Sequence, residues 1–247
     1  MNQYRLFQIL GSGSFGCVRL CRNENDGELY AAKCISKKRM QRKGGLGRSP
    51  RGAPIIGCDP LQDLRREIAI LKKLDHPHIV RLYEVMEDPL VDIVYMVFEL
   101  IRLGPVMDIT TKSDSATPFS EERARMYFDQ LLLAVEYLHY HHVIHRDIKP
   151  ANLLLHSKDV IRLADFGVSC TFEGSDAVLN KTVGTPAFLA PEAVSVDGGE
   201  FGGRAVDVWA MGVTLFCFLF GRTPWNASSL VTLYRRIRND PADIEPS

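Results

Sequence analysis

The chain has 247 residues, which is long enough to bury a sizeable core in one large domain or in two lobes. Its hydrophobic content of 46% and charged content of 24% are typical of a water-soluble globular protein. Thirty basic residues balance thirty acidic ones, so the net charge gives no reason to expect nucleic acid or a membrane as a partner.

A glycine-rich stretch near the N-terminus, residues 11–16, separates two segments that alternate as strands do, 6–10 and 16–21. The pattern Gly-x-Gly-x-x-Gly also opens dinucleotide-binding folds, but there it leads into a helix. Here the residues that follow favour a strand, so we expect a hairpin. Because glycine has no Cβ atom, the backbone N–H groups of this hairpin can approach phosphates closely.

A lysine lies in the third predicted strand, residues 30–35, among small and apolar neighbours. Such an ammonium group is costly to bury without a partner. Residues 61–74 have the spacing of an amphipathic helix, and Glu67 lies beside its apolar stripe. We expect Glu67 to face Lys33 and to direct it towards phosphates. The alternatives are an exposed strand lysine and a glutamate paired with arginine or water.

Between these elements, residues 40–60 contain five glycines, several basic residues and no periodicity. The composition predicts a mobile basic loop. A passive spacer and a docking site for acidic partners are equally open interpretations of this loop.

The second half of the chain is predicted to be mostly helical. The segment 206–220 is apolar but too short for a bilayer, which favours a buried core helix that ends at Gly221. Asp207 begins this helix, and its carboxylate either caps the helix or braces a nearby loop. The other expected elements are strands at 80–84, 93–98 and 161–164 and helices at 118–139, with Ser120 as N-cap, and 230–238.

The residues best suited to chemistry lie at 145–152 and 165–167. Asp147 can accept the proton of an attacking hydroxyl, and Lys149 can neutralise a transferring phosphate. Asn152 and Asp165 supply the oxygen ligands that Mg²⁺ prefers. Two carboxylates, an amide and a lysine at this spacing indicate phosphoryl transfer.

The cysteines indicate the cellular compartment, and the histidines bear on whether the chain binds a metal. The six cysteines form no CxxC pair and no zinc-like spacing, so we expect reduced thiols in the cytoplasm, with the nucleus as an alternative. The N-terminus has no apolar stretch of signal-peptide length. His139, His141 and His142 are expected to be solvated or to cap a helix, rather than to bind metal.

The loop His-Arg-Asp at 145–147, with Asn152 five residues later and Asp-Phe-Gly at 165–167, resembles the protein kinase family. Lys149 and the Gly-Thr-Pro at 184–186 are similar to its serine/threonine branch. The resemblance implies ATP and Mg²⁺ as cofactors. Together with the glycine hairpin, the positions it implies for nucleotide binding are Leu10, Gly11, Ser12, Gly13, Ser14, Phe15, Gly16, Cys17, Val18, Ala31, Lys33, Glu99, Leu100 and Leu154.

The implied fold is the α+β, bilobal protein-kinase fold. Its small lobe has five antiparallel strands and one main helix and is expected at residues 1–101, including the insert 40–60. The mostly helical large lobe is expected at 102–247. Because the family's last helices have no counterpart after 230–238, we expect a fold truncated at its C-terminus.

Residues 67–77, 95–100 and 207–215 resemble the calcium/calmodulin-dependent protein kinase kinases. That resemblance implies a kinase acting on activation-loop threonines of downstream kinases, namely calmodulin kinases and the AMP-activated kinase. Calmodulin is an expected partner only through a C-terminal segment that is not in this sequence. The alternative is a non-catalytic module that binds nucleotide or a partner.

Overall fold

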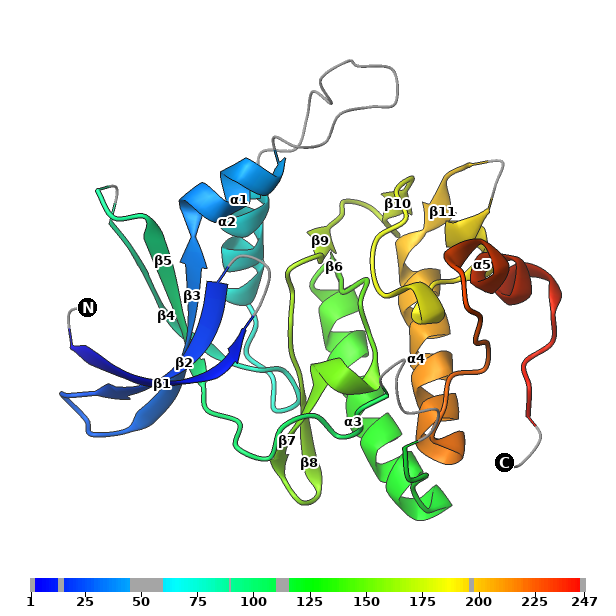
Figure 1. Ribbon diagram of the computed structural model, residues 1–247, viewed down its shortest axis with the longest axis horizontal. Coiled ribbons are helices and arrows are strands. Elements are labelled where there is room, and N and C mark those ends of the chain that lie inside the picture. The colour runs from blue at the N-terminus through cyan, green and yellow to red at the C-terminus, as the bar shows by residue number, and fades with distance from the viewer. Residues whose placement is uncertain are drawn as a thin grey trace. The chain divides into compact units, whose positions relative to one another are not determined.

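The computed structural model describes residues 3–12, 16–44, 60–88, 90–109, 116–195 and 198–244. The chain divides into two compact units (Figure 1). The small unit is Met1–Asp75 with Val80–Ile101, and the large unit is His76–Ile79 with Arg102–Ser247. The segment His76–Ile79 belongs to the large unit because the N–H of Leu163 donates to the carbonyl of His78 at 2.8 Å.

The small unit is built on an antiparallel sheet with the strand order β1-β2-β3-β5-β4 (Figure 1). This confirms the predicted five-stranded sheet, although its fourth strand starts and ends later than expected. One face of the sheet is buried around Cys21, Ala32, Cys34 and Val97. The strands are β1 Tyr4–Ser12, β2 Gly16–Asn23, β3 Leu29–Ser36, β4 Leu82–Glu87 and β5 Ile93–Glu99.

Two helices accompany the sheet, α1 (Lys37–Gly44) and α2 (Pro60–Leu71). Helix α2 matches the predicted main helix but ends earlier, at Leu71. The interpretation of 40–60 as a loop is wrong for residues 40–44, which belong to α1, and for Pro60, which begins α2; residues 45–59 lie outside the described residues.

Helix α1 forms because two side chains accept hydrogen bonds from its first N–H groups. One belongs to Ser36, directly before the helix, and the other to Asp92, directly before β5. The N–H of Lys38 donates to Oδ1 of Asp92 at 2.8 Å, and the N–H of Arg39 donates to Oγ of Ser36 at 3.1 Å.

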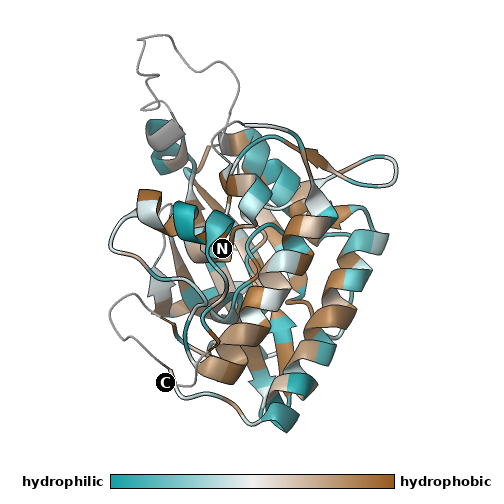
Figure 2. Cartoon of the chain, turned by 90° about the vertical axis from the view of Figure 1, so that its right-hand side faces the viewer, coloured by the Kyte–Doolittle hydropathy of each residue, from teal (hydrophilic) through white to brown (hydrophobic). Residues whose placement is uncertain are grey.

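The large unit is organised by helices α3 (Glu121–Tyr140), α4 (Gly203–Phe220) and α5 (Leu230–Asn239). Helix α3 begins as predicted, because Oγ of Ser120 accepts a hydrogen bond from the N–H of Arg123 at 3.3 Å. Helix α4 ends as predicted at Gly221, which adopts φ 67°. In Figure 2, α3 alternates hydrophobic and hydrophilic residues, whereas α4 is hydrophobic along most of its length.

Helix α4 has the length and composition of a membrane span, but it packs against α3 inside the large unit. Its composition is explained by this position in the core. The side chains of α4 and α3 that are buried at the centre of the unit include Tyr127, Leu131, Leu138, Met211, Cys217 and Phe218.

Short elements connect these helices and carry the loop that was predicted to be catalytic. The short strands pair as three two-stranded sheets, β6 with β9, β7 with β8, and β10 with β11. They are β6 Val143–Ile144, β7 Leu153–Ser157, β8 Val160–Leu163, β9 Cys170–Thr171, β10 Val178–Leu179 and β11 Phe201–Gly202, with 3₁₀ turns η1 Pro150–Asn152, η2 Pro186–Phe188 and η3 Pro191–Val194.

Candidate active site

In the small unit, the predicted lysine and glutamate meet. Nζ of Lys33 on β3 lies 2.7 Å from Oε1 of Glu67 on α2, and the glutamate side chain is only 9% exposed. A buried carboxylate is stabilised by a close cation and in turn holds the ammonium in one place. The lysine side chain as a whole is 30% exposed.

The glycine hairpin is formed by the end of β1 and the start of β2, where Ser12 lies opposite Cys17. Gly13, Ser14 and Phe15 lie outside the described residues. A Cβ atom on Gly16 would overlap the backbone carbonyl oxygen of Cys34, so this glycine is required by the close approach of β3. Among the described residues, a Cβ atom on Gly11 would meet nothing within 4 Å.

The remaining positions implied for nucleotide binding lie on several strands. Leu10 is on β1 and is 48% exposed, Val18 is on β2 opposite Lys33, and Ala31 is on β3. The last residue of β5, Glu99, accepts a hydrogen bond from the N–H of Arg81 at 2.8 Å through its side chain, and Leu100 follows it. In the large unit, Leu154 lies on β7 and bridges Pro105.

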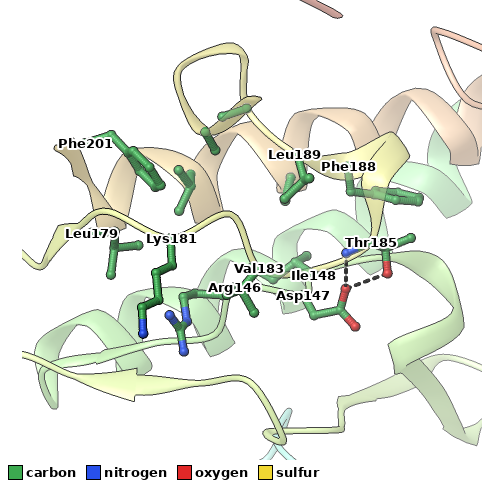
Figure 3. Close-up of a pocket in the computed structure, with 14 residues that line it drawn as sticks. Arg146, Asp147, Ile148, Leu179, Lys181, Val183, Thr185, Phe188, Leu189 and Phe201 are labelled. Atoms are coloured by element: carbon green, nitrogen blue, oxygen red, sulfur yellow. Dashed lines mark hydrogen bonds between the residues drawn. The ribbon is translucent and has the colours of Figure 1, made fainter. Parts of the chain in front are cut away.

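In the large unit, the carboxylate of Asp147 is the centre of a hydrogen-bond network. Its Oδ1 accepts from the backbone N–H of Thr185 at 2.9 Å and from Oγ1 of Thr185 at 2.6 Å (Figure 3). Its Oδ2 accepts from Nζ of Lys149 at 2.8 Å and from Nδ2 of Asn152 at 3.0 Å. Nζ of Lys149 also donates to Oγ1 of Thr185 at 2.7 Å. These bonds hold the carboxylate and the ammonium group in one fixed orientation.

Asp165 lies next to this network through the backbone. The N–H of Ala164 donates to the carbonyl of Asn152 at 2.9 Å, which ties the segment before Asp165 to η1. Asp165 itself adopts φ 65°, an uncommon conformation that a non-glycine residue keeps only when its surroundings impose it. The following Phe166 is buried, and its ring packs edge-on against His145 at 4.9 Å between centroids.

Asp207 braces the loop at 145–152, which is predicted to be catalytic and is called the catalytic loop below. Its carboxylate accepts hydrogen bonds from the backbone N–H groups of His145 and Arg146, each at 2.9 Å. Because α4 begins at Gly203, Asp207 lies in the second turn, and the alternative interpretation of Asp207 as a helix cap is wrong. Arg146 adopts φ 67°, so the brace also stabilises a strained backbone.

The family model of the protein kinase domain matches residues 4–245. The chain belongs to the protein kinase family. This confirms the fold class and the assignment to ATP-dependent serine/threonine protein kinases, which was based on the loop at 145–152 and on Asp-Phe-Gly.

Relatives of this kinase domain carry related names. The chain is 45% identical over 98% of its length to a calcium/calmodulin-dependent protein kinase kinase of Caenorhabditis elegans, of which it covers 45%. It is 45% identical to the serine/threonine-protein kinase ssp1 of Schizosaccharomyces pombe, covering 37% of it, and 40% identical to the serine/threonine-protein kinase GRIK2 of Arabidopsis thaliana, covering 57%. The chain therefore spans about half the length of these curated relatives, or less.

Protein kinases use ATP and Mg²⁺, and the residues of this kinase domain fit both. Because Nδ2 of Asn152 is engaged by Asp147, its carbonyl oxygen is the atom that would bind a metal. With the carboxylate of Asp165 it would give Mg²⁺ two hard oxygen ligands, and phosphate oxygens complete such sites. Gly11 and Lys33 would contact the phosphates.

The kinase domain also contains a pocket beside Asp147, formed within the large unit (Figure 3). Its wall is mostly apolar, with Val183, Phe188 and Leu189 among the lining residues. Arg146 and Lys181 also line it, so cationic groups border an apolar surface.

One supporting residue of the kinase site was misinterpreted from the sequence. His139 was expected to be solvated or to cap α3, but its Nε2 lies 2.9 Å from Oδ2 of Asp207, and its side chain is mostly buried. It thus orients the carboxylate that braces the catalytic loop. No local pattern could have revealed this contact, because the partner is 68 residues away in the sequence.

Proposed function

We propose that this chain transfers the γ-phosphoryl group of ATP to serine or threonine hydroxyls of protein substrates. The main observation behind the proposal is the hydrogen-bond network around Asp147. Its donors are Lys149 and Asn152, which were predicted to take part in catalysis, and Thr185, which follows Gly184. A carboxylate held in this way is already oriented, and it can accept the proton of an incoming hydroxyl once one of its four donors gives way.

Each residue has a distinct task in this proposal. Asp147 orients the substrate hydroxyl and takes its proton, while Lys149 stabilises negative charge beside it. Lys33, held by Glu67, binds phosphate oxygens, and the glycine hairpin covers them. Asn152 and Asp165 would hold Mg²⁺, which neutralises phosphate charge when it is bound. Catalysis then rests on positioning and electrostatics.

The direct test is phosphoryl transfer from ATP to a protein substrate, measured together with nucleotide binding on the same preparation. Magnesium-dependent transfer supports the proposal. ATP-dependent thermal stabilisation without transfer would instead favour the alternative, a non-catalytic module that binds nucleotide or a partner.

We further propose that the substrates are the activation-loop threonines of downstream kinases, with calmodulin kinases and the AMP-activated kinase as the first to test. For the calmodulin kinases, support comes from the name of the Caenorhabditis elegans relative, calcium/calmodulin-dependent protein kinase kinase. Purified kinase-dead forms of these enzymes, with the activation-loop threonine intact or replaced by alanine, give a matched pair of substrates. Equal phosphorylation of both forms would contradict the proposal.

We propose that the protein is located in the cytoplasm, with the nucleus as the alternative. The proposal is supported by the free thiols of Cys17, Cys21, Cys34 and Cys217, which suit a reducing compartment. Imaging of a fluorescent fusion, with a secretory-pathway marker as the comparison, tests it.

A further inference from the structure

Two cysteines face each other across neighbouring strands at the base of the glycine hairpin. Cys17, the second residue of β2, lies directly opposite Cys34 on β3. Both side chains point to the face of the sheet that packs around Cys21 and Val97. Directly opposed residues of antiparallel strands have Cβ atoms about 4.5–5.5 Å apart, close to the separation that a disulfide requires.

The sheet register places the two thiols opposite each other, but their environments differ. Cys34 is buried, whereas Cys17 is partly exposed. Burial raises the pKa of the Cys34 thiol to about 11, and the neighbouring Cys17 thiol adds to this shift, while the charge of Arg19 opposes it. Cys34 is therefore the less reactive thiol, and an oxidant reaches Cys17 first.

We propose that Cys17 and Cys34 are a peroxide-sensitive dithiol that closes to a reversible disulfide between β2 and β3. In the first step the sulfur of Cys17 is oxidised by hydrogen peroxide to a sulfenic acid, and one water leaves. In the second step the sulfur of Cys34 attacks the sulfenic sulfur, the S–S bond forms and a second water leaves. Two thiols thus lose two electrons and two protons to one peroxide.

Proximity explains why a buried thiol can complete the second step. Cys34 is held against Cys17 by the sheet register, so the attack is intramolecular and needs no diffusional encounter. Cys21 lies on the same face but is opposite Tyr30; the Sγ atoms of Cys21 and Cys34 each donate to a backbone carbonyl oxygen at 3.5 Å. This difference in register makes Cys34 the partner of Cys17 and makes Cys21 a matched control.

The bond would act at the base of the hairpin. Cys17 follows Gly16, and Cys34 follows Lys33, so the link would join the strand leaving the glycine turn to the strand that carries the lysine. Gly16 is already in close contact with the backbone of Cys34. The hairpin could then no longer separate from β3 at this point.

The experiment is thiol mapping on the 247-residue chain after full reduction and removal of the reductant. The protein is treated with hydrogen peroxide, remaining thiols are blocked with N-ethylmaleimide, and a digest made without reductant is analysed by mass spectrometry. We expect one linked peptide pair containing Cys17 and Cys34, a fall of two in the titratable thiols of the monomer, and recovery of both with dithiothreitol. The Cys21→Ala variant should form the same link.

The Cys17→Ala variant should form no link and keep its remaining thiols, and because Cys17 is partly exposed this variant is expected to fold. Recovery of Cys17 as a sulfinic acid beside a maleimide-blocked Cys34 would overturn the proposal. A link from Cys17 to any other cysteine, or unchanged thiols after peroxide treatment, would do so equally. None of these measurements depends on kinase activity, so their failure is distinct from a failure of the proposed function.

Discussion

Thr185 donates two hydrogen bonds to a single oxygen of Asp147, one from its backbone N–H at 2.9 Å and one from its hydroxyl at 2.6 Å. The hydroxyl also accepts from Lys149. Thr185 therefore connects the segment after Gly184 to both groups that are proposed to act on the substrate hydroxyl.

The first prediction tests the role of the Thr185 hydroxyl separately from that of its backbone N–H. Thr185→Val keeps the shape and the N–H but removes two bonds to charged groups, and we expect kcat to fall by about tenfold or more. Thr185→Ser retains the hydroxyl and should stay within about threefold of the original protein. Steady-state kcat and KM, with melting curves as a check on folding, measure this. Equal turnover of the two variants would contradict the proposed role.

The second prediction concerns Asp147. Asp147→Asn removes the proton acceptor while keeping the side-chain shape, so kcat should fall by about 10²–10⁴-fold with ATP binding retained. Asp159→Asn, at an exposed position in the turn between β7 and β8, is the matched control and should leave turnover unchanged. The assignment of Asp147 would be untenable if its variant turned over at the rate of the control.

The third prediction concerns stability. The Asp207 side chain is fully buried and accepts bonds from two backbone N–H groups and from His139. In the Asp207→Asn variant, the side-chain NH2 group would face N–H groups that are themselves donors. We expect this to lower the free energy of unfolding by about 3 kcal/mol. Urea denaturation measures the loss. Asp129→Asn, exposed on α3, should change stability by less than about 0.5 kcal/mol.

The fourth prediction compares two glycines. Gly16→Ala forces a methyl group onto the carbonyl oxygen of Cys34, which should destabilise the small unit by about 2 kcal/mol or more and weaken nucleotide binding. Gly212→Ala on α4 meets no atom within 4 Å and should instead stabilise the protein by about 0.5–1 kcal/mol. Thermal melting with and without nucleotide tests both. Similar shifts for the two variants would show that the close approach at Gly16 is not rigid.

The fifth prediction follows from His145. Burial lowers the pKa of this imidazole, against the opposing charges of Asp207, Asp147 and Asp165. Below about pH 6.5 the unfolded chain therefore binds a proton that the folded protein does not. Stability should fall with decreasing pH, by up to about 1.4 kcal/mol per pH unit for this one group.

Urea denaturation between pH 7 and pH 5 measures that slope. Burial also lowers the pKa of His76, which adds in the same direction. The His145→Gln variant cannot take up the proton, so its stability should depend less steeply on pH. A slope that is identical in the variant would exclude His145 as its source.

Local chemistry made much of the fold predictable. Ser120 and Gly221 mark the helix ends that they were expected to mark, because a side-chain cap and a left-handed glycine act on their own neighbours. Lys33 and Glu67 could also be paired from the sequence, because the lysine lies among small and apolar neighbours and the glutamate lies beside the apolar stripe of its helix.

The failures have a common physical origin in contacts between distant residues. Helix α1 has no apolar periodicity, and it is stabilised partly by Asp92, more than 50 residues further along the chain. The role of His139 depends in the same way on Asp207. The contact between Cys17 and Cys34 requires the register of β2 against β3, which neither segment specifies alone.

Because Asp207 braces the catalytic loop, the conformation of this loop depends on the direction in which α4 points the Asp207 side chain. Each residue of an α-helix advances the side-chain direction by about 100°, so inserting one residue between Gly203 and Asp207 would turn the carboxylate away from the N–H groups of His145 and Arg146. Such an insertion would leave every residue of the kinase motifs in place. The start of α4 is therefore a segment where changes of length, and not only of residue type, would inactivate the enzyme.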